Sequence, residues 1–125
     1  MGGHQQMLVA SARWTFQLRD ARSLKDKRRV ASRIRDRVRA RFPVAIAEVE
    51  ALDDKRRLVL GVAAVGNDAV VLRSTLDKVA AFVDDLYLAE LVSRPVVIEP
   101  FSGDELTYGL KTALDTSTPE PDSWL

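Results

Sequence analysis

The chain of 125 residues contains no cysteine and a single histidine, His4. The absence of cysteine excludes disulfide bonds, iron–sulfur clusters and thiol catalysis, and it is consistent with a reducing compartment. A metal site at His4 would need partner ligands that the sequence does not supply. We therefore expect neither a bound metal nor a cofactor.

The sequence also lacks long hydrophobic runs and the motifs of common enzymes. No apolar stretch approaches the roughly 18–20 residues that a membrane-spanning helix needs, and the N-terminus does not have the pattern of a signal peptide. The motif G-x-S-x-G, the P-loop and the motif G-x-G-x-x-G are absent. We expect a soluble, cytoplasmic protein that is not an enzyme and that has no evident small-molecule substrate.

What the sequence does contain is a high density of positive charge in one segment. Residues 22–41 hold ten Lys or Arg against two Asp, a net charge of +8, whereas the whole chain has a formal charge of +1. The remaining nine basic and sixteen acidic residues sum to −7. This asymmetry is more informative about binding partners than the near-neutral total.

The same segment has the pattern of an amphipathic helix between Ser23 and Phe42. Ser23 is a favourable N-cap, and Asp26 three residues later predicts a capping box. Pro43 predicts the end of the helix, because the residue before a proline avoids the α region. The apolar side is formed by Leu24, Val30, Ala31, Ile34, Val38 and Phe42. Lys27 projects near the middle of this apolar side.

The cations of this helix repel one another. Lys25, Arg29, Arg33 and Arg39 are expected along one exposed line, and like charges four residues apart cost roughly 0.2–0.5 kcal/mol per pair in an isolated helix. Cations near the N-terminus also oppose the helix dipole. An anionic partner would relieve the repulsion, either a polyanion or carboxylates elsewhere in this fold. The predicted nucleic-acid-binding residues are Arg22, Lys25, Arg28, Arg29, Arg33, Arg35 and Arg39.

The rest of the chain predicts four strands and a second helix. The strands are expected at residues 7–19, 44–51, 57–66 and 89–99, and the helix at 69–86. Pro95 indicates an edge position or a bulge in the last strand. The β-α-β-β-α-β order predicts an α+β ferredoxin-like sandwich, in which a four-stranded antiparallel sheet of order 4-1-3-2 carries both helices on one face.

A change of character after residue 99 divides the chain. Residues 1–99 are expected to form the ferredoxin-like domain, with a loose N-terminus at 1–6, and residues 100–125 a C-terminal extension. Ser102 is a suitable cap for a short helix, and a disordered tail is expected after it. The apolar residues at helical spacing in the extension are Leu106, Leu110, Ala113 and Leu114. Its aromatic residues are candidates for packing on the sheet or on another subunit.

Two functional sites known on folds of this kind fit the sequence poorly. A base-stacking sheet needs aromatic residues on its exposed face, whereas Trp14 and Phe16 alternate with polar residues and fall on the predicted core side. An acylphosphatase-like site needs a glycine-rich loop with an arginine beside an asparagine. The loop 19–23 has arginines but no glycine, and Asn67 lies at the start of the second helix.

Glu48 and Glu50 are the two acidic residues of the second predicted strand. They could act as a pair of catalytic carboxylates, but salt bridges to Arg13 or Lys27 are the favoured interpretation. The direction in which Glu48 points depends on whether a bulge interrupts the strand.

Four segments resemble the YlxP-like family, a group of small bacterial proteins of unknown function. They are ARSLKDKRRV at 21–30, FPVAIAEVE at 42–50, LGVAAVGND at 60–68 and LDKVAAFVD at 76–84. The resemblance extends over about residues 7–98 and implies a ferredoxin-like fold. It also implies a gene found among transcription-termination and translation-initiation genes, beside a ribosome-binding factor, which suggests a ribosome or RNA role by association. The resemblance does not reach the extension.

The leading hypothesis is a non-catalytic RNA- or ribosome-associated binding protein whose basic helix contacts phosphates. Such a surface reads phosphate positions, so binding should depend strongly on salt and weakly on sequence, which suits a structured RNA or a ribosomal particle. The alternative is a protein-interaction or homo-oligomerisation module without nucleic acid. It would use a strand edge or the open sheet face, around Val9, Val59, Ala63 and Val65. Membrane binding is disfavoured, because the apolar side of the helix is needed for the core.

Overall fold

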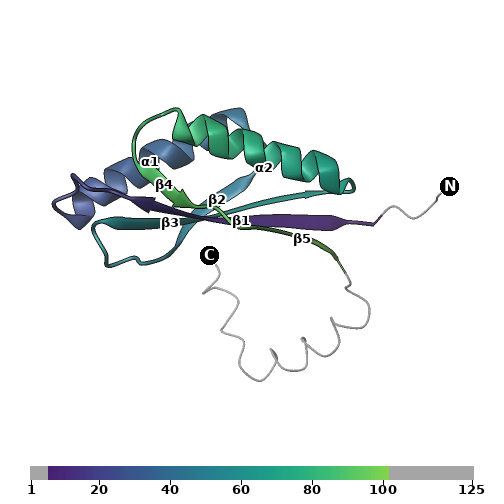
Figure 1. Cartoon of the computed structure of the whole chain (residues 1–125), viewed down its shortest axis with the longest axis horizontal. Helices are drawn as coiled ribbons and strands as arrows, with labels where there is room; N and C mark the ends of the chain where they lie inside the picture. The colour runs from purple at the N-terminus through teal and green to yellow at the C-terminus, as the bar shows by residue number, and fades with distance from the viewer. Residues whose placement is uncertain (1–5, 102–125) are drawn as a thin grey trace, which may run out of the picture.

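The computed structural model of the chain describes residues 6–101, and two helices lie on one face of a single antiparallel sheet (Figure 1). The elements are β1 (Leu8–Gln17), α1 (Leu24–Arg41), β2 (Ala45–Glu50), β3 (Arg57–Gly66), α2 (Ala69–Asp84), β4 (Glu90–Ser93) and β5 (Val96–Pro100). The predicted ferredoxin-like α+β sandwich is therefore confirmed. The predicted extension lies outside the described residues, apart from Pro100 and Phe101.

The sheet has the order β2-β3-β1-β4, and β5 also pairs with β1. This is the predicted order, but the sheet has five strands instead of four because the last predicted strand is divided in two. The break falls at Arg94 and Pro95, where a proline has no N–H to continue the ladder. Arg13 N–H donates to the Pro95 carbonyl at 3.1 Å, so β1 forms a hydrogen bond across the break.

The core lies between the helices and one face of the sheet. In β1, alternate residues are buried, as the period of two predicts: Ala10, Ala12, Trp14 and Phe16. The two helices contribute Ala31, Ile34, Val38, Leu72, Leu76, Val79, Ala80 and Val83. This arrangement fixes which side of α1 is buried, and therefore which of its cations face outward.

The opposite face of the sheet carries no helix or strand within residues 6–101 (Figure 1). Four residues were predicted to contribute to an interaction surface there. Val65 is 67% exposed, and Val9 and Ala63 are half-buried. Val59 is fully buried, which makes the prediction wrong for this residue.

The start of α1 is fixed by reciprocal hydrogen bonds around Ser23. Ser23 Oγ accepts from the Asp26 backbone N–H at 3.1 Å, as the predicted N-cap requires. Asp26 Oδ2 accepts from the backbone N–H of Arg22 at 2.8 Å. The capping box therefore closes one residue before the N-cap, not at Ser23 itself.

We expect Ser23→Ala to lower the free energy of unfolding by about 1 kcal/mol, because the Asp26 N–H loses its acceptor. Ser23→Asp restores an acceptor and places a negative charge at the positive end of the helix dipole, so it should stay close to the wild type. Urea unfolding followed by circular dichroism compares the two. Equal destabilisation by both substitutions would contradict the capping role of the side chain.

Candidate nucleic-acid interface

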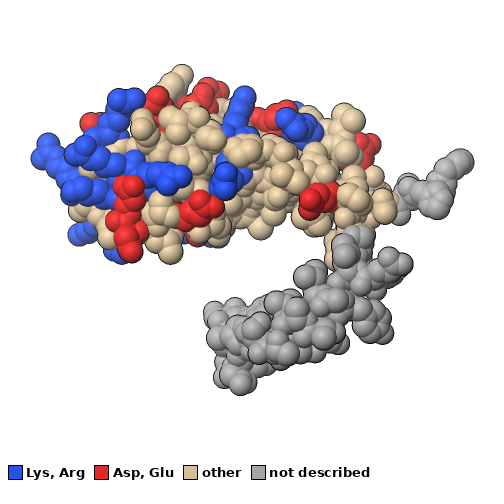
Figure 2. All heavy atoms as spheres, turned by 60° about the horizontal axis from the view of Figure 1, so that its bottom comes forward, with Lys and Arg blue, Asp and Glu red and all other residues tan. Residues whose placement is uncertain are grey.

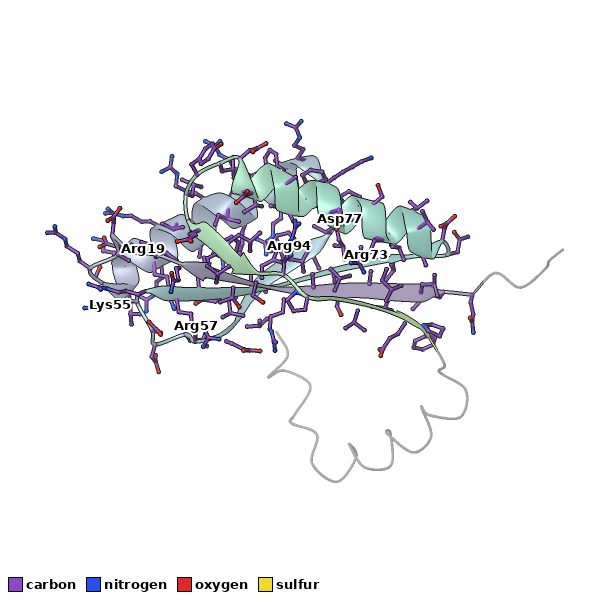
Figure 3. All side chains as sticks on the ribbon, in the orientation of Figure 1. Arg19, Lys55, Arg57, Arg73, Asp77 and Arg94 are labelled. Carbon is purple, nitrogen blue, oxygen red and sulfur yellow. The ribbon has the colours of Figure 1, made fainter. Side chains whose placement is uncertain are left out.

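The outer side of α1 displays most of the predicted binding residues. Its buried side consists of Lys27, Ala31, Ile34 and Val38. Arg35 is half-buried, and the exposed members of the predicted set are Arg22, Lys25, Arg28, Arg29, Arg33 and Arg39. Figure 2 shows Lys and Arg side chains gathered at the left end of the molecule, where Figure 1 places the start of α1 together with the β2–β3 turn and the end of β1. Arg19, Lys55 and Arg57 lie at this end beside α1 (Figure 3).

Three ion pairs form within residues 6–101, and none of them uses a predicted binding residue. Arg13 pairs with Glu50 at 3.5 Å, and Arg19 with Glu90 at 2.9 Å. The third pair, at 3.0 Å, joins Lys27 to Glu48. In the described part of the chain, the seven predicted cations therefore have no carboxylate within ion-pair distance.

In the C-terminal half of α1, two exposed cations are held by contacts within the fold. Arg39 Nη2 donates to the Ile46 carbonyl of the edge strand β2 at 2.9 Å, so this guanidinium is held against the sheet. Arg41 lies 5.0 Å from the Phe82 ring centroid, a cation–π distance. Arg39 is exposed, as predicted, but its guanidinium already holds the Ile46 carbonyl. The cations of the predicted line without such a contact in the described residues are therefore Lys25, Arg29 and Arg33.

Arg35 is held at the border of the core. Its Nη2 lies 3.4 Å from Ser32 Oγ, one turn earlier on α1. Its Nε is buried and has no hydrogen-bond partner in the described residues. Arg35 can therefore contribute positive potential to the surface, but it presents fewer free donors than Arg29 or Arg33.

Lys27 belongs to the core, with a side chain only 1% exposed. Its ammonium donates to the carbonyl oxygens of Ala51 (2.7 Å), Leu52 (3.2 Å) and Arg57 (3.3 Å). These three acceptors use the three N–H donors, so the contact with Glu48 is ionic and is not a fourth hydrogen bond. Lys27 is a structural cation that holds the β2–β3 turn.

The helical pattern placed Lys27 near the middle of the apolar side. It did not reveal the carbonyl cage, by which we mean the three backbone carbonyls that accept hydrogen bonds from the Lys27 ammonium. Ala51 adopts a φ of 55°, a left-handed conformation that turns the chain after β2. Successive carbonyls of the turn therefore point at one ammonium. Alanine has no special preference for this conformation, so the sequence gives little signal for it.

Glu48 and Glu50 each form a salt bridge, to Lys27 and Arg13 respectively, as predicted. The register of β2 against β3 shifts between the two residues. Since Lys27 lies on the helix side of the sheet and Arg13 on the open face, the shift sends the two carboxylates to opposite faces. They therefore do not form a catalytic pair.

The acylphosphatase-like arrangement does not assemble either. In the β1–β3 register, Leu8 pairs with Gly66 and Gln17 with Arg57. Asn67, next to Gly66, therefore lies at the opposite end of the sheet from the loop 19–23 that follows Gln17.

A hollow of about 510 Å³ lies beside the start of α1, and its acidic lining borders the positive surface on one side. Its lining includes Asp20, Asp26, Asp84 and Glu90.

Within residues 6–101, no three His, Cys, Asp or Glu side chains are grouped closely enough to hold a metal ion, and His4 lies outside this range. Neither helix of the described chain is long and apolar enough to cross a membrane.

Known proteins match most of the described chain. Residues 9–95 match a family model described as protein of unknown function, DUF503. The uncharacterized protein YlxP of Bacillus subtilis (strain 168) is 43% identical over 65 residues, which are 52% of this chain and 71% of that protein. This agrees with the resemblance found in the sequence. The match to the family model ends before the extension at 100–125.

Two solved structures are similar to this chain at low sequence identity. A dimeric ferredoxin-like protein of unknown function from Thermobifida fusca YX is 15% identical, with a TM-score of 0.46 over 79% of this chain and 95% of that one. The de novo designed protein Foldit4 is 14% identical, with a TM-score of 0.43 over 78% of this chain and 98% of that one. Because the family model covers more than half of the residues, the chain belongs to the family of proteins of unknown function DUF503.

Proposed function

We propose that this protein is a non-catalytic RNA-binding protein that contacts phosphates of a structured RNA, such as one in a ribosomal particle, through the outer side of α1. The observation that supports the proposal is the set of exposed cations without carboxylate partners in the described chain. Within residues 6–101, no carboxylate lies within ion-pair distance of these cations to relieve their mutual repulsion. Phosphates of another molecule would do so.

The spacing of the cations suits a polyanion better than a single small anion. Lys25, Arg29 and Arg33 follow one another every four residues, which is about 6 Å along a helix axis. The row therefore extends over two turns and offers one cation after another to successive charges. A flexible row of side chains of this kind recognises the position of phosphates and not the identity of bases.

The sheet offers no obvious platform for base stacking. The outward residues of β1 after Val9 are Ser11, Arg13, Thr15 and Gln17, none of them aromatic. Aromatic side chains on the sheet are what single-stranded RNA modules use to hold splayed bases. A folded RNA, with its phosphates held in a fixed arrangement, fits the helix surface better.

Co-sedimentation with ribosomal particles tests the proposal. We expect the tagged protein to sediment with the particles at low salt, to be released as salt is raised, and to be lost after nuclease treatment. Binding that resists both salt and nuclease would contradict RNA binding. Such a result would favour the second candidate, a protein-interaction or homo-oligomerisation module, for which the exposed Val65 and Val97 on the open sheet face are the supporting observation.

A further inference from the structure

The open face of the sheet is apolar toward the end where β1 begins and β5 ends. The strand register brings small or β-branched residues side by side on it, and we call this set the open apolar patch: Val9, Ser11, Ala45, Ala63, Val65 and Val97. Glu99 lies opposite Val9 on this face, between Val97 and Phe101, and it is the acidic residue at the β5 border of the patch. Other charged residues lie further along the same face, where Arg13 pairs with Glu50. Figure 2, which turns this face forward, shows few charged side chains toward the right, where β5 ends.

The patch is apolar, as a buried surface is, but its large side chains are exposed in the described chain. Val65 is 67% exposed and Val97 51%, and Phe101 beside them is 57% exposed. Large apolar side chains gathered in this way on a small domain mark a contact site. The patch is also flat, because Ser11, Ala45 and Ala63 are small. A helix could therefore approach the sheet closely.

The chain itself leaves the sheet beside this patch. The Phe101 N–H donates to the Met7 carbonyl at 2.8 Å, so strand pairing continues past β5. Side chains alternate along a strand, so Phe101 lies on the same face as Val97. Residues 102–125 therefore follow directly from the border of the patch.

The sequence after Phe101 has an apolar side of matching size. Leu106, Leu110, Ala113 and Leu114 recur at helical spacing after the cap residue Ser102. A helix of residues 102–114 would be about 20 Å long, and four strands at their usual spacing are about 15–19 Å across. The segment is therefore long enough to cover the patch.

We propose that the segment 102–114 packs its apolar side on the open apolar patch and covers this face of the sheet. A second copy of the chain would lose translational and rotational entropy on association, which opposes binding. The segment is joined to the patch at Phe101, so its effective concentration is in the millimolar range without any partner. The inference does not depend on RNA binding by α1.

Thiol labelling tests this proposal in the full chain, which has no native cysteine. Ser11→Cys places one thiol within the patch, and Ser74→Cys places a matched thiol on the exposed surface of α2. Each is combined with Leu106→Asp and Leu110→Asp, which remove the apolar side of the segment. We expect these changes to accelerate maleimide labelling at position 11 about tenfold or more, since tenfold corresponds to about 1.4 kcal/mol of docking free energy. Labelling at position 74 should not change.

Two outcomes would overturn the proposal. Equal labelling at position 11 with and without Leu106→Asp and Leu110→Asp would show that the segment does not cover the patch. Labelling at position 11 that slows as protein concentration rises would show that a second copy covers it. Circular dichroism of each variant verifies that the domain remains folded, so either rate can be interpreted.

Discussion

Replacing Lys27 by methionine is expected to lower the free energy of unfolding by about 3–5 kcal/mol, as the removal of one partner from a buried ionic cluster does. Methionine keeps the length and the apolar stem of the side chain, so the loss measures the ammonium group. Without it, the carbonyls of Ala51, Leu52 and Arg57 lose a buried donor, and Glu48 loses its counter-charge. Urea unfolding followed by circular dichroism gives the value.

Lys25→Met is the matched control for this prediction. It removes the same charge from the same helix two residues earlier, but from an exposed position, and should change the stability by no more than about 0.5 kcal/mol. Glu48→Gln should cost less than Lys27→Met, because the three carbonyl hydrogen bonds remain. A loss of less than about 1 kcal/mol on Lys27→Met would show that the cage does not stabilise the β2–β3 turn.

Reversing the charge of Lys25, Arg29 and Arg33 to glutamate is expected to weaken binding to a structured RNA by about a hundredfold or more, which corresponds to about 1 kcal/mol for each lost contact. Arg39 is left intact because its guanidinium holds the Ile46 carbonyl. Glutamate is a good helix former and suits the N-terminal half of a helix, so the fold should not be weakened. Fluorescence polarisation with a labelled ribosomal RNA fragment measures the affinity.

A second triple variant separates the role of α1 from that of total charge. Arg73, Lys78 and Arg94 are exposed cations outside α1, and Figure 3 shows Arg73 and Arg94 near Asp77, away from the start of α1. Their replacement by glutamate changes the net charge by the same amount. We expect this control to keep affinity within about tenfold of the wild type, as for a change in long-range attraction alone. Equal losses in the two triple variants would contradict a binding role specific to α1.

The local signals in the sequence predicted the elements well. Ser23 and Pro43 bounded α1 correctly, because a cap and a helix breaker act within a few residues of the chain. The alternation in β1 and the spacing in α1 predicted the core, because burial follows directly from those periods. These same signals indicated which side of α1 carries the exposed cations.

The sequence was less informative wherever a contact depends on distant segments. The hydrogen bond from Arg39 to Ile46 exists because β2 returns along α1, and nothing in the helix sequence shows which edge carbonyl it meets. Pro95 indicated an edge position or a bulge in the last strand. The sequence did not show that Arg13 of β1 would donate a hydrogen bond to the Pro95 carbonyl across the break. Val59 shows the same limit, since its position on the open face did not predict its burial.

The salt dependence of RNA binding by the wild-type protein is the most direct test of phosphate binding by α1. Each phosphate contact contributes about −0.7 to −0.9 to the slope of log K against log salt concentration, so contacts by Lys25, Arg29 and Arg33 alone predict a slope of about −2 to −3. We expect a slope at least this steep in the wild type, and one shallower by a similar amount when these three residues are glutamates. A flat salt response of the wild-type protein would contradict phosphate binding by α1.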